Sequence, residues 1–269
     1  MPYREIPYDQ LRDEYKQLWE SMKILTAREG IVSRIAEKSI ANRARYRIVE
    51  GRTGVPWYWV ACAHSLESNQ NFTRHLHNGD PLTARTIRVP AGRPKAGSPP
   101  FDWTESAMDA LTLKGLHLIR DWTVERSLYE LERYNGWGYR LFHPGTLSPY
   151  LWSFTNHYTS GKYIADGVWS TTHASDQCGA APIMRRILAL DSETDKKVSE
   201  VKETIFSQTT ESLQEYLNQL GSDPKLATDG VYGPKTRNAV KSFQTKANLV
   251  IDGIAGIKTW AAIKLRIQQ

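Results

Sequence analysis

The segment Gly54-Val-Pro-Trp-Tyr-Trp-Val-Ala-Cys-Ala-His-Ser-Leu-Glu67 decides how the first part of this chain folds. Pro56 suits the first turn of a helix, where a missing backbone N–H breaks no hydrogen bond. The residues up to Leu66 are apolar on nearly all sides, which predicts a helix buried within a core. Glu67 follows, directly before the polar run Ser-Asn-Gln-Asn. The pattern therefore predicts a carboxyl group at the carboxyl-terminal end of a buried helix.

The predicted surroundings of Glu67 favour its protonated form. The end of a helix presents the negative pole of the helix dipole, and apolar surroundings disfavour an ionised carboxyl group. Both effects raise the pKa, which a general acid for glycosidic cleavage requires near neutral pH. The alternative is an exposed glutamate just past a helix end, with no catalytic role.

Helical patterns dominate on either side of this segment. Apolar residues at helical spacing predict an amphipathic helix over 9–26, and a second helical pattern covers 29–49. Asp102 is placed to cap a further helix, and another is expected over 123–134, ended by two glycines. Between them, residues 71–94 carry an Asn-Gly-Asp-Pro turn and several threonines, which predict a β-hairpin.

The C-terminal part contains an internal repeat. Asp229-Gly-Val-Tyr-Gly-Pro-Lys-Thr236 recurs as Asp252-Gly-Ile-Ala-Gly-Ile-Lys-Thr259, with the aspartate, both glycines, the lysine and the threonine in the same places. The first glycine of each copy allows a tight turn with positive φ, and Lys-Thr opens a helix. Apolar stripes around the two copies predict three short helices. The stripes consist of Leu213, Leu217 and Leu220, then Val240 and Phe243, then Trp260, Ile263 and Ile267.

Length and composition indicate two folded units. The chain has 269 residues, more than one typical domain of roughly 100–200 residues. We expect a first domain over 1–190, a polar linker over 191–206 and a second domain over 207–269. The net charge of +6 suits an anionic partner. No block of five like charges occurs, so a nucleic-acid-binding arm is not expected. A monomer is the expected state.

Targeting signals and membrane spans are not expected. Residues 1–20 carry charges where a signal peptide has its apolar stretch, which predicts synthesis in the cytoplasm. No run of 18 apolar residues occurs, so stable membrane insertion is not expected. Action outside the membrane would require release by a separate route.

Residues 207–267 resemble the peptidoglycan-binding type 1 module, a three-helix domain. The resemblance rests on the paired D-G-x-x-G turns and on an F-Q-x-x-x-N-L-x-x-D-G connection that begins at Phe243. It implies that peptidoglycan is the partner of this chain. The turn residues themselves are expected to be scaffold.

Residues 54–189 resemble the lysozyme-like superfamily, in particular phage and bacterial lysozyme-family proteins. In the transglycosylase branch a catalytic glutamate ends a buried helix and is followed by serine, as in Glu67-Ser68. A later Tyr-Asn-Gly segment packs below the sugar, and residues 134–136 match it. The resemblance implies a mainly α-helical domain with a small β-hairpin, and Glu67 as the general acid.

The same resemblance suggests further site residues. Asp80 and Thr86 would position water opposite Glu67, as a second carboxylate does in an inverting enzyme. A lytic transglycosylase needs no second carboxylate because a hydroxyl of the sugar attacks, and Asp80 would then be a turn residue. Tyr134 and Asn135 would hold the sugar and orient Glu67. Further candidates for the groove are Trp103, Tyr139, Asn156, His157 and Tyr158. For each aromatic residue the alternative is core packing.

Metal and thiol chemistry have weaker support. His75 and His77 would share one face of a strand, but no H-E-x-x-H motif accompanies them. Cys62 lies in the apolar helix, where a thiol is buried and inert, and Cys178 lacks a recognisable partner for an amidase. We therefore expect no metal and no cofactor.

The sequence as a whole predicts a modular lysin of the endolysin type. Its first domain would be a muramidase that cleaves the β-1,4 bond between N-acetylmuramic acid and N-acetylglucosamine, and its second would hold it on the wall. A lytic transglycosylase and a non-catalytic wall-binding protein are the alternatives, and chitin-like or chitosan-like substrates stay open.

Overall fold

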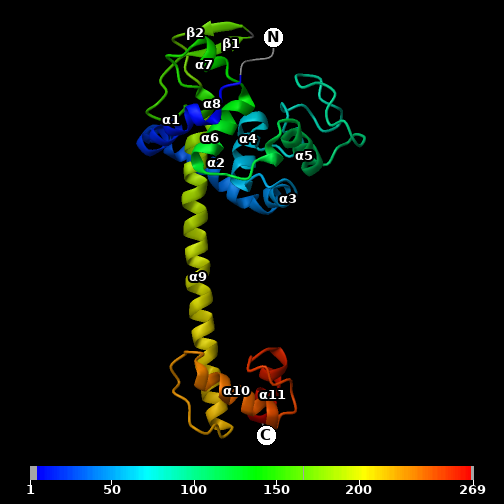
Figure 1. Ribbon diagram of the computed structural model, residues 1–269, viewed down its shortest axis with the longest axis vertical. Coiled ribbons are helices and arrows are strands. Elements are labelled where there is room, and N and C mark those ends of the chain that lie inside the picture. Colours follow the sequence, from blue (N-terminus) through cyan, green and yellow to red (C-terminus); the bar gives the residue numbers. More distant parts are fainter. Residues whose placement is uncertain (1–4, 166, 268–269) are drawn as a thin grey trace. The chain divides into compact units, whose positions relative to one another are not determined.

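The computed structural model describes residues 5–165 and 167–267. The chain divides into two compact units, residues 1–192 and 193–269. It is mainly helical with one small sheet, as the sequence predicts (Figure 1). The helices of the first unit are α1 (Tyr8–Ser21), α2 (Glu29–Ala41), α3 (Arg43–Thr53), α4 (Trp57–Ser68), α5 (Trp103–Leu113), α6 (Val124–Asn135), α7 (Gly138–Phe142), α8 (Pro149–Trp152) and the first turns of α9 (Ala180–Gln219). Short 3-10 turns cover Thr26–Arg28 and Leu116–Leu118.

The core of the first unit is built around α4. Trp59 and Val60 have no exposed surface, and the helix is in contact with α2, α3 and α6. His64 is buried in the same helix, with its Nδ1 3.0 Å from the Tyr46 hydroxyl and its Nε2 3.2 Å from the Asn71 carbonyl. Burial lowers the pKa of His64 to about 4, so the ring is neutral at physiological pH. The segment that the sequence singled out therefore contains a helix in which every residue except Tyr58 and Glu67 is buried.

The other predicted helices are present, with shifted ends. The pattern over 9–26 corresponds to α1, and the pattern over 123–134 to α6. The pattern over 29–49 divides into α2 and α3 because the Asn42 side chain donates to a carbonyl of α2 and its backbone leaves the helical region. Asp102 caps α5 as predicted, accepting two backbone N–H groups of the first turn at 2.8 and 3.2 Å.

Residues 71–94 do not form the predicted hairpin. They form a series of turns with one isolated bridge, between Arg74 and Pro81. Prolines within the segment lack the N–H that a strand ladder needs. The Asp80 carboxylate and the Thr86 hydroxyl instead accept backbone N–H groups that a neighbouring strand would otherwise bind.

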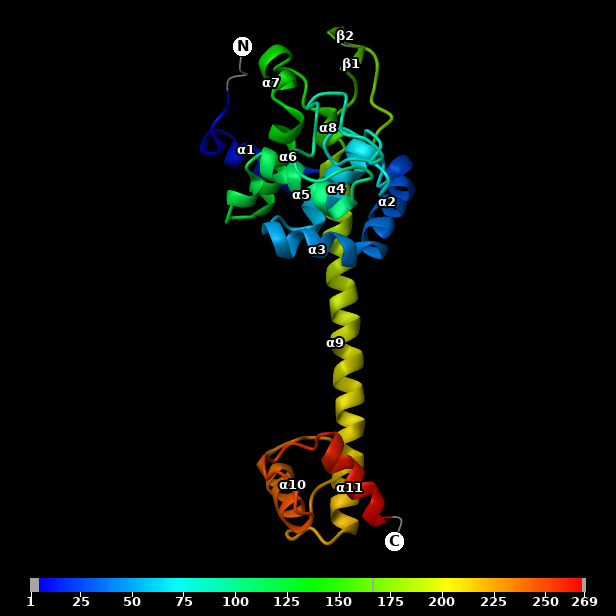
Figure 2. The same ribbon diagram turned by 90° about the vertical axis from the view of Figure 1, so that its right-hand side faces the viewer.

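The small sheet lies later in the chain. β1 (Lys162–Ala165) pairs antiparallel with β2 (Val168–Ser170), with Tyr163 opposite Trp169. The hairpin and α7 lie at the same end of the first unit (Figures 1 and 2). The rings of Tyr139 and Trp169 join them, with centroids 5.6 Å apart.

Residues 191–206, expected as a polar linker, lie within the continuous helix α9. The stretch contains neither glycine nor proline, and its Lys, Glu, Ser and Thr residues tolerate helical geometry. Low hydrophobicity excluded this stretch from a core, but it did not exclude a helix. None of the helices in the described residues has the length and apolarity needed to cross a membrane.

The second unit packs α10 (Pro234–Lys246) and α11 (Ile257–Ile267) against the last turns of α9 (Figure 2). The predicted apolar stripes form its core. Their buried members are Leu213, Leu217, Val240, Phe243 and Ile263, and Leu226, which the stripes did not include, is buried with them.

Each copy of the repeated turn is organised by one buried glutamine. The Gln244 amide oxygen accepts the Gly253 N–H at 2.9 Å. Its amide nitrogen lies 2.8 Å from the Asp252 carboxylate, 3.0 Å from the Ile254 carbonyl and 3.1 Å from the Thr259 hydroxyl. The first copy repeats this pattern around Gln214, with its amide oxygen 3.0 Å from the Gly230 nitrogen and its amide nitrogen bonded to Asp229, Val231 and Thr236. The repeat in sequence is therefore a repeated hydrogen-bond network.

We predict that Gln244→Leu destabilises the second unit. The side chain is 1% exposed, so leucine would leave the buried partners of the amide unsatisfied, at a cost of about 2–3 kcal/mol. Thr245→Ala, which removes an exposed hydroxyl on the same helix, should change stability by less than about 0.5 kcal/mol. Hydrogen exchange of the α10 and α11 amides in the full chain measures both effects. Unchanged protection in Gln244→Leu would contradict this role.

Candidate active site

Glu67 lies in the last turn of α4, and it lines a cavity of about 350 Å³. The helix ends at Asn69, which adopts the left-handed conformation. The cavity is bounded by the end of α4, by α5 and α6, and by the loop over 77–90. Its described lining consists of Glu67, His77, Asn78, Arg88, Val89, Pro90, Ala110, Leu113, Lys114, Tyr134 and Asn135. Glu67 is the one carboxylate among these residues.

Tyr150 holds the carboxyl group of Glu67 in place. This residue of α8 donates its hydroxyl to Glu67 Oε1 at 2.9 Å. Oε2 forms no hydrogen bond with the part of the chain that the structure describes. Burial raises the pKa of Glu67 to about 7, against the smaller lowering effects of the Tyr150 hydrogen bond and the Lys114 charge. The group can therefore carry a proton near neutral pH and offer it from Oε2.

A glycine lets the neighbouring loop reach the end of α4. Gly79 has a φ of +73°, and a Cβ there would lie 2.5 Å from the Glu67 carbonyl oxygen. Any other residue would clash with this backbone and adopt an unfavourable conformation. The loop that forms one wall of the cavity depends on this close approach.

The structure gives Asp80 and Thr86 a bracing role in that loop. Asp80 is buried and accepts the backbone N–H groups of Ile87 and Arg88 at 2.8 and 3.0 Å, and its other oxygen binds Arg88 Nε at 2.6 Å. These bonds lower the pKa of Asp80 despite its burial. Thr86 donates to the Pro90 carbonyl at 2.5 Å. Both carboxylate oxygens of Asp80 are engaged, and neither residue lines the cavity.

Tyr134 and Asn135 are the predicted residues that the fold brings to Glu67. Tyr134 is buried, and its hydroxyl donates to the Leu76 carbonyl at 2.9 Å, so it fixes the cavity wall. Asn135 is exposed in the same lining. Its amide is therefore accessible from the cavity.

Trp103 belongs to the core and not to a groove, contrary to the prediction. It is 2% exposed, and its ring centroid lies 4.6 Å from that of His64 and 4.7 Å from that of Phe72. Tyr139 packs against Tyr163 in the cluster beside the hairpin. Neither residue lines the Glu67 cavity.

Asn156, His157 and Tyr158 make contacts away from the Glu67 cavity. Asn156 Oδ1 accepts the backbone N–H of Lys23 at 2.6 Å. His157 Nε2 donates to the Leu18 carbonyl at 2.8 Å. His157 and Tyr158 line a different hollow of about 390 Å³, together with His143 and Trp169. That hollow shares no lining residue with the Glu67 cavity.

The histidines and cysteines considered for other chemistries have structural partners. His75 bonds Ser106 and the Ala84 carbonyl, and His77 Nε2 lies 2.8 Å from Asp109. Within the described residues no group of three or more His, Cys, Asp and Glu side chains is arranged to hold a metal. Cys62 and Cys178 are buried, and burial raises the pKa of the Cys178 thiol to about 12. Both thiols are therefore poor nucleophiles.

Sequence reasoning missed Tyr150 and Lys114. Tyr150 reaches Glu67 from a position 83 residues later in the chain. Pro149-Tyr-Leu-Trp suggests a short helix but not the direction of its tyrosine. Lys114 follows α5, and no motif sets it apart from other lysines in the chain. No local pattern could have placed either residue beside Glu67.

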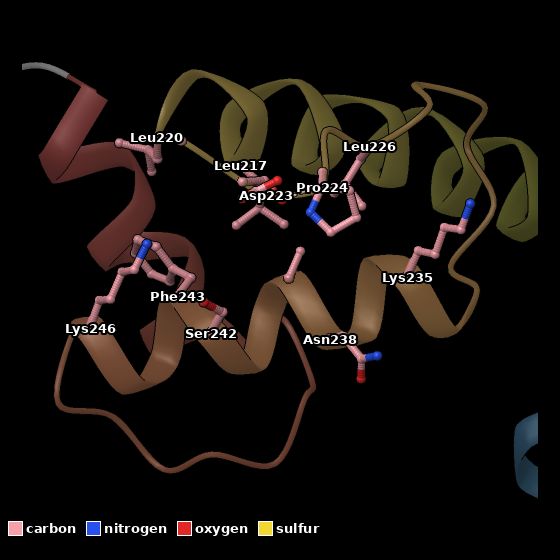
Figure 3. Close-up of a pocket in the computed structure, with 13 residues that line it drawn as sticks. Leu217, Leu220, Asp223, Pro224, Leu226, Lys235, Asn238, Ser242, Phe243 and Lys246 are labelled. Atoms are coloured by element: carbon pink, nitrogen blue, oxygen red, sulfur yellow. Dashed lines mark hydrogen bonds between the residues drawn. The ribbon is translucent and has the colours of Figure 1, made fainter.

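The second unit has a hollow of its own, of about 170 Å³, between the end of α9 and α10 (Figure 3). Leu217, Leu220 and Phe243 supply apolar surface. Lys235 and Lys246 lie at opposite ends of it along α10 (Figure 3). Asp223 also lines it, so the hollow combines apolar surface with charges of both signs.

Comparisons with known proteins identify the second unit. Residues 207–263 match the family model described as "Putative peptidoglycan binding domain". An uncharacterized protein in the bpoA1 3′ region of Kitasatospora aureofaciens is 30% identical over 109 residues, which make up 40% of this chain and 81% of that protein. No solved structure matches the chain significantly.

We predict that Glu67→Gln stabilises the protein at high pH. The folded state holds the Glu67 proton more tightly than the unfolded chain does, so stability falls as the pH rises from about 4.5 to about 7. Each pKa unit corresponds to about 1.4 kcal/mol, so glutamine should add up to roughly 3 kcal/mol at pH 8. It should change little at pH 4.

Denaturant unfolding at the two pH values measures this difference. Glu37→Gln, at an exposed position within α2, is the matched control and should show no pH-dependent gain. Equal effects of Glu67→Gln at pH 4 and pH 8 would contradict a raised pKa.

Proposed function

We propose that this chain, which belongs to the same family as the uncharacterized Kitasatospora protein and carries a peptidoglycan-binding domain, cleaves the glycan strands of peptidoglycan. The bond cleaved would be the β-1,4 linkage between N-acetylmuramic acid and N-acetylglucosamine. The observation that carries the proposal is a carboxyl group with a pKa of about 7, held by Tyr150 in a cavity. Such a group is suited to protonate a leaving glycosidic oxygen.

In the proposed reaction Glu67 Oε2 gives its proton to the glycosidic oxygen while the bond from that oxygen to C1 breaks. The resulting carboxylate then takes a proton from the group that attacks C1. In a hydrolase this group is water, and the product has a reducing muramic end. In a lytic transglycosylase it is a hydroxyl of the same sugar, and the product has a 1,6-anhydro ring.

One observation favours the second outcome. Glu67 is the one carboxylate among the described residues that line the cavity, and the hydrogen bonds of Asp80 occupy both of its oxygens. Hydrolysis with inversion would require a second group to activate water. Intramolecular attack needs only Glu67, first as acid and then as base.

The peptidoglycan-binding domain would keep the enzyme on an insoluble substrate. A tethered catalytic unit experiences a high effective concentration of glycan even when the affinity of each contact is modest. The net charge of +6 favours approach to an anionic envelope. We also propose that the protein acts on the cell wall after release from the cytoplasm, as in host cell lysis.

Glu67→Gln tests the catalytic role. We expect wall lysis to fall by roughly 10²–10⁴-fold, the usual contribution of general acid catalysis, while sedimentation with purified peptidoglycan is retained. Glu37→Gln should lyse like the unmodified protein. Lysis that survives Glu67→Gln would overturn the assignment. Mass spectrometry of the soluble products, which differ by one water, decides between hydrolysis and transglycosylation.

Tyr150→Phe should shift the pH profile. The Tyr150 hydroxyl donates to the Glu67 carboxyl and lowers its pKa, so its loss should raise that pKa further. The alkaline limb of kcat/KM, which reports the free enzyme, should then move to higher pH, with a lower maximum because the carboxyl is less well oriented. Tyr58→Phe, on α4 but bonded to the Trp122 carbonyl, is the control and should leave the limb in place. An unmoved limb in Tyr150→Phe would show that this bond does not tune the acid.

A further inference from the structure

The cavity beside Glu67 contains a positioned cation. Lys114 immediately follows α5, and its Nζ donates to the Tyr134 carbonyl at 3.0 Å. The same Nζ lies 5.1 Å from the centre of the Tyr134 ring. An ammonium group has three N–H donors, so two remain for a ligand. Because the side chain is half-buried and tethered, it is directed at the cavity before any ligand arrives.

The charges around the cavity leave Lys114 without a counter-ion. Arg88 is neutralised by buried Asp80, at 2.6 Å. His77 is uncharged, since burial lowers its pKa. Lys114 forms no ion pair within the described part of the chain. When Glu67 carries its catalytic proton, the described lining of the cavity therefore holds one cation, Lys114, without a directly paired carboxylate.

Among the described residues, groups outside the cavity lining form no ion pair with Lys114 either. Arg133 approaches Lys114 from α6 and is itself paired with Glu130 at 2.6 Å. Glu5 acts on Lys114 only through space, because no ion pair joins them and its carboxylate instead accepts the Trp137 Nε1–H at 3.1 Å. The arrangement suits a ligand that brings its own negative charge.

We infer that Lys114 binds a carboxylate of the glycan next to the bond that Glu67 protonates, and so selects carboxylated over neutral β-1,4-linked N-acetylated glycans. This inference rests on the proposed function and deepens it. Muramic acid carries a carboxylate on its lactyl group or on an attached peptide stem, whereas chitin has none and chitosan is cationic. The exposed amide of Asn135 would serve an acetamido group, which peptidoglycan and chitin share, so the discrimination falls to Lys114.

Binding to a catalytically blocked protein tests the inference. The background is full-length Glu67→Gln, which leaves the ligand intact. The ligands are peptidoglycan tetrasaccharides, one with free lactyl carboxylates and one bearing peptide stems. Each is compared with a copy whose carboxylates have been converted to neutral N-methylamides. The two arms distinguish the lactyl carboxylate from those of the stem.

We expect at least one free ligand to bind about tenfold more tightly than its capped copy, as for a charge-assisted hydrogen bond. Adding Lys114→Met should remove that preference and leave the affinity for the capped copy unchanged. Lys38→Met is the matched control, because Lys38 also donates to a backbone carbonyl, of Asn69 at 3.2 Å, but does not line the cavity. It should keep the preference. The peptidoglycan-binding domain is the same in all variants, so its contacts cancel when one variant is compared with another.

Three results would overturn the inference: no binding of either ligand, equal binding of free and capped copies, or equal weakening of both by Lys114→Met. The last would mean that Lys114 serves only the cavity structure or the Glu67 pKa. Lys114→Arg keeps the charge and should restore the preference, which guards against a misfolded methionine variant. Wall lysis by the protein without these substitutions tests the proposed function separately, so its failure is distinguishable from failure of the Lys114 contact.

Discussion

The enclosure of α4 is the constraint on which the first unit depends. A helix that is apolar on all sides can be stable only when other elements cover every face, and α2, α3 and α6 do so. The last turn of such a helix is fixed in space, and with it the position of Glu67. The carboxyl group is half-buried at the wall of the cavity, with protein atoms on most sides. Its raised pKa is therefore a consequence of packing, and the helix dipole acts in the same direction.

The loop that follows α4 is organised by side chains and not by strand pairing. Gly79 brings the chain against the Glu67 carbonyl, and Asp80 and Thr86 hold the turn that follows. The side chains of Asp80 and Thr86 form their hydrogen bonds within the loop itself. Among the described residues the cavity lining thus has a single carboxylate, that of Glu67, which Tyr150 orients from α8 and beside which Lys114 lies. That combination accounts for both the chemistry and the substrate charge that we propose.

The two units are stabilised in different ways. The first buries a large aromatic core in which the His64 ring is hydrogen-bonded at both nitrogens. The second has a smaller core and relies on Gln214 and Gln244, each of which joins a turn to the following helix through one amide. These networks engage one carboxylate oxygen of Asp229 and of Asp252, while Lys235 and Lys246 line the hollow between α9 and α10.

The sequence by itself determined the helical class, the buried helix that ends at Glu67, the Asp102 cap and the three-helix repeat module. Each of these follows from local periodicity or from a turn motif, which are properties of neighbouring residues. The tertiary structure alone decided which distant residues meet Glu67. It brought Tyr150 and Lys114 to the cavity, moved Trp103 into the core and placed His157 at another hollow. It also replaced the expected hairpin over 71–94 by turns, because Asp80 and Thr86 bind the backbone groups that strands would have paired. Local patterns specify elements, whereas the direction of a side chain across a core depends on packing among all of them.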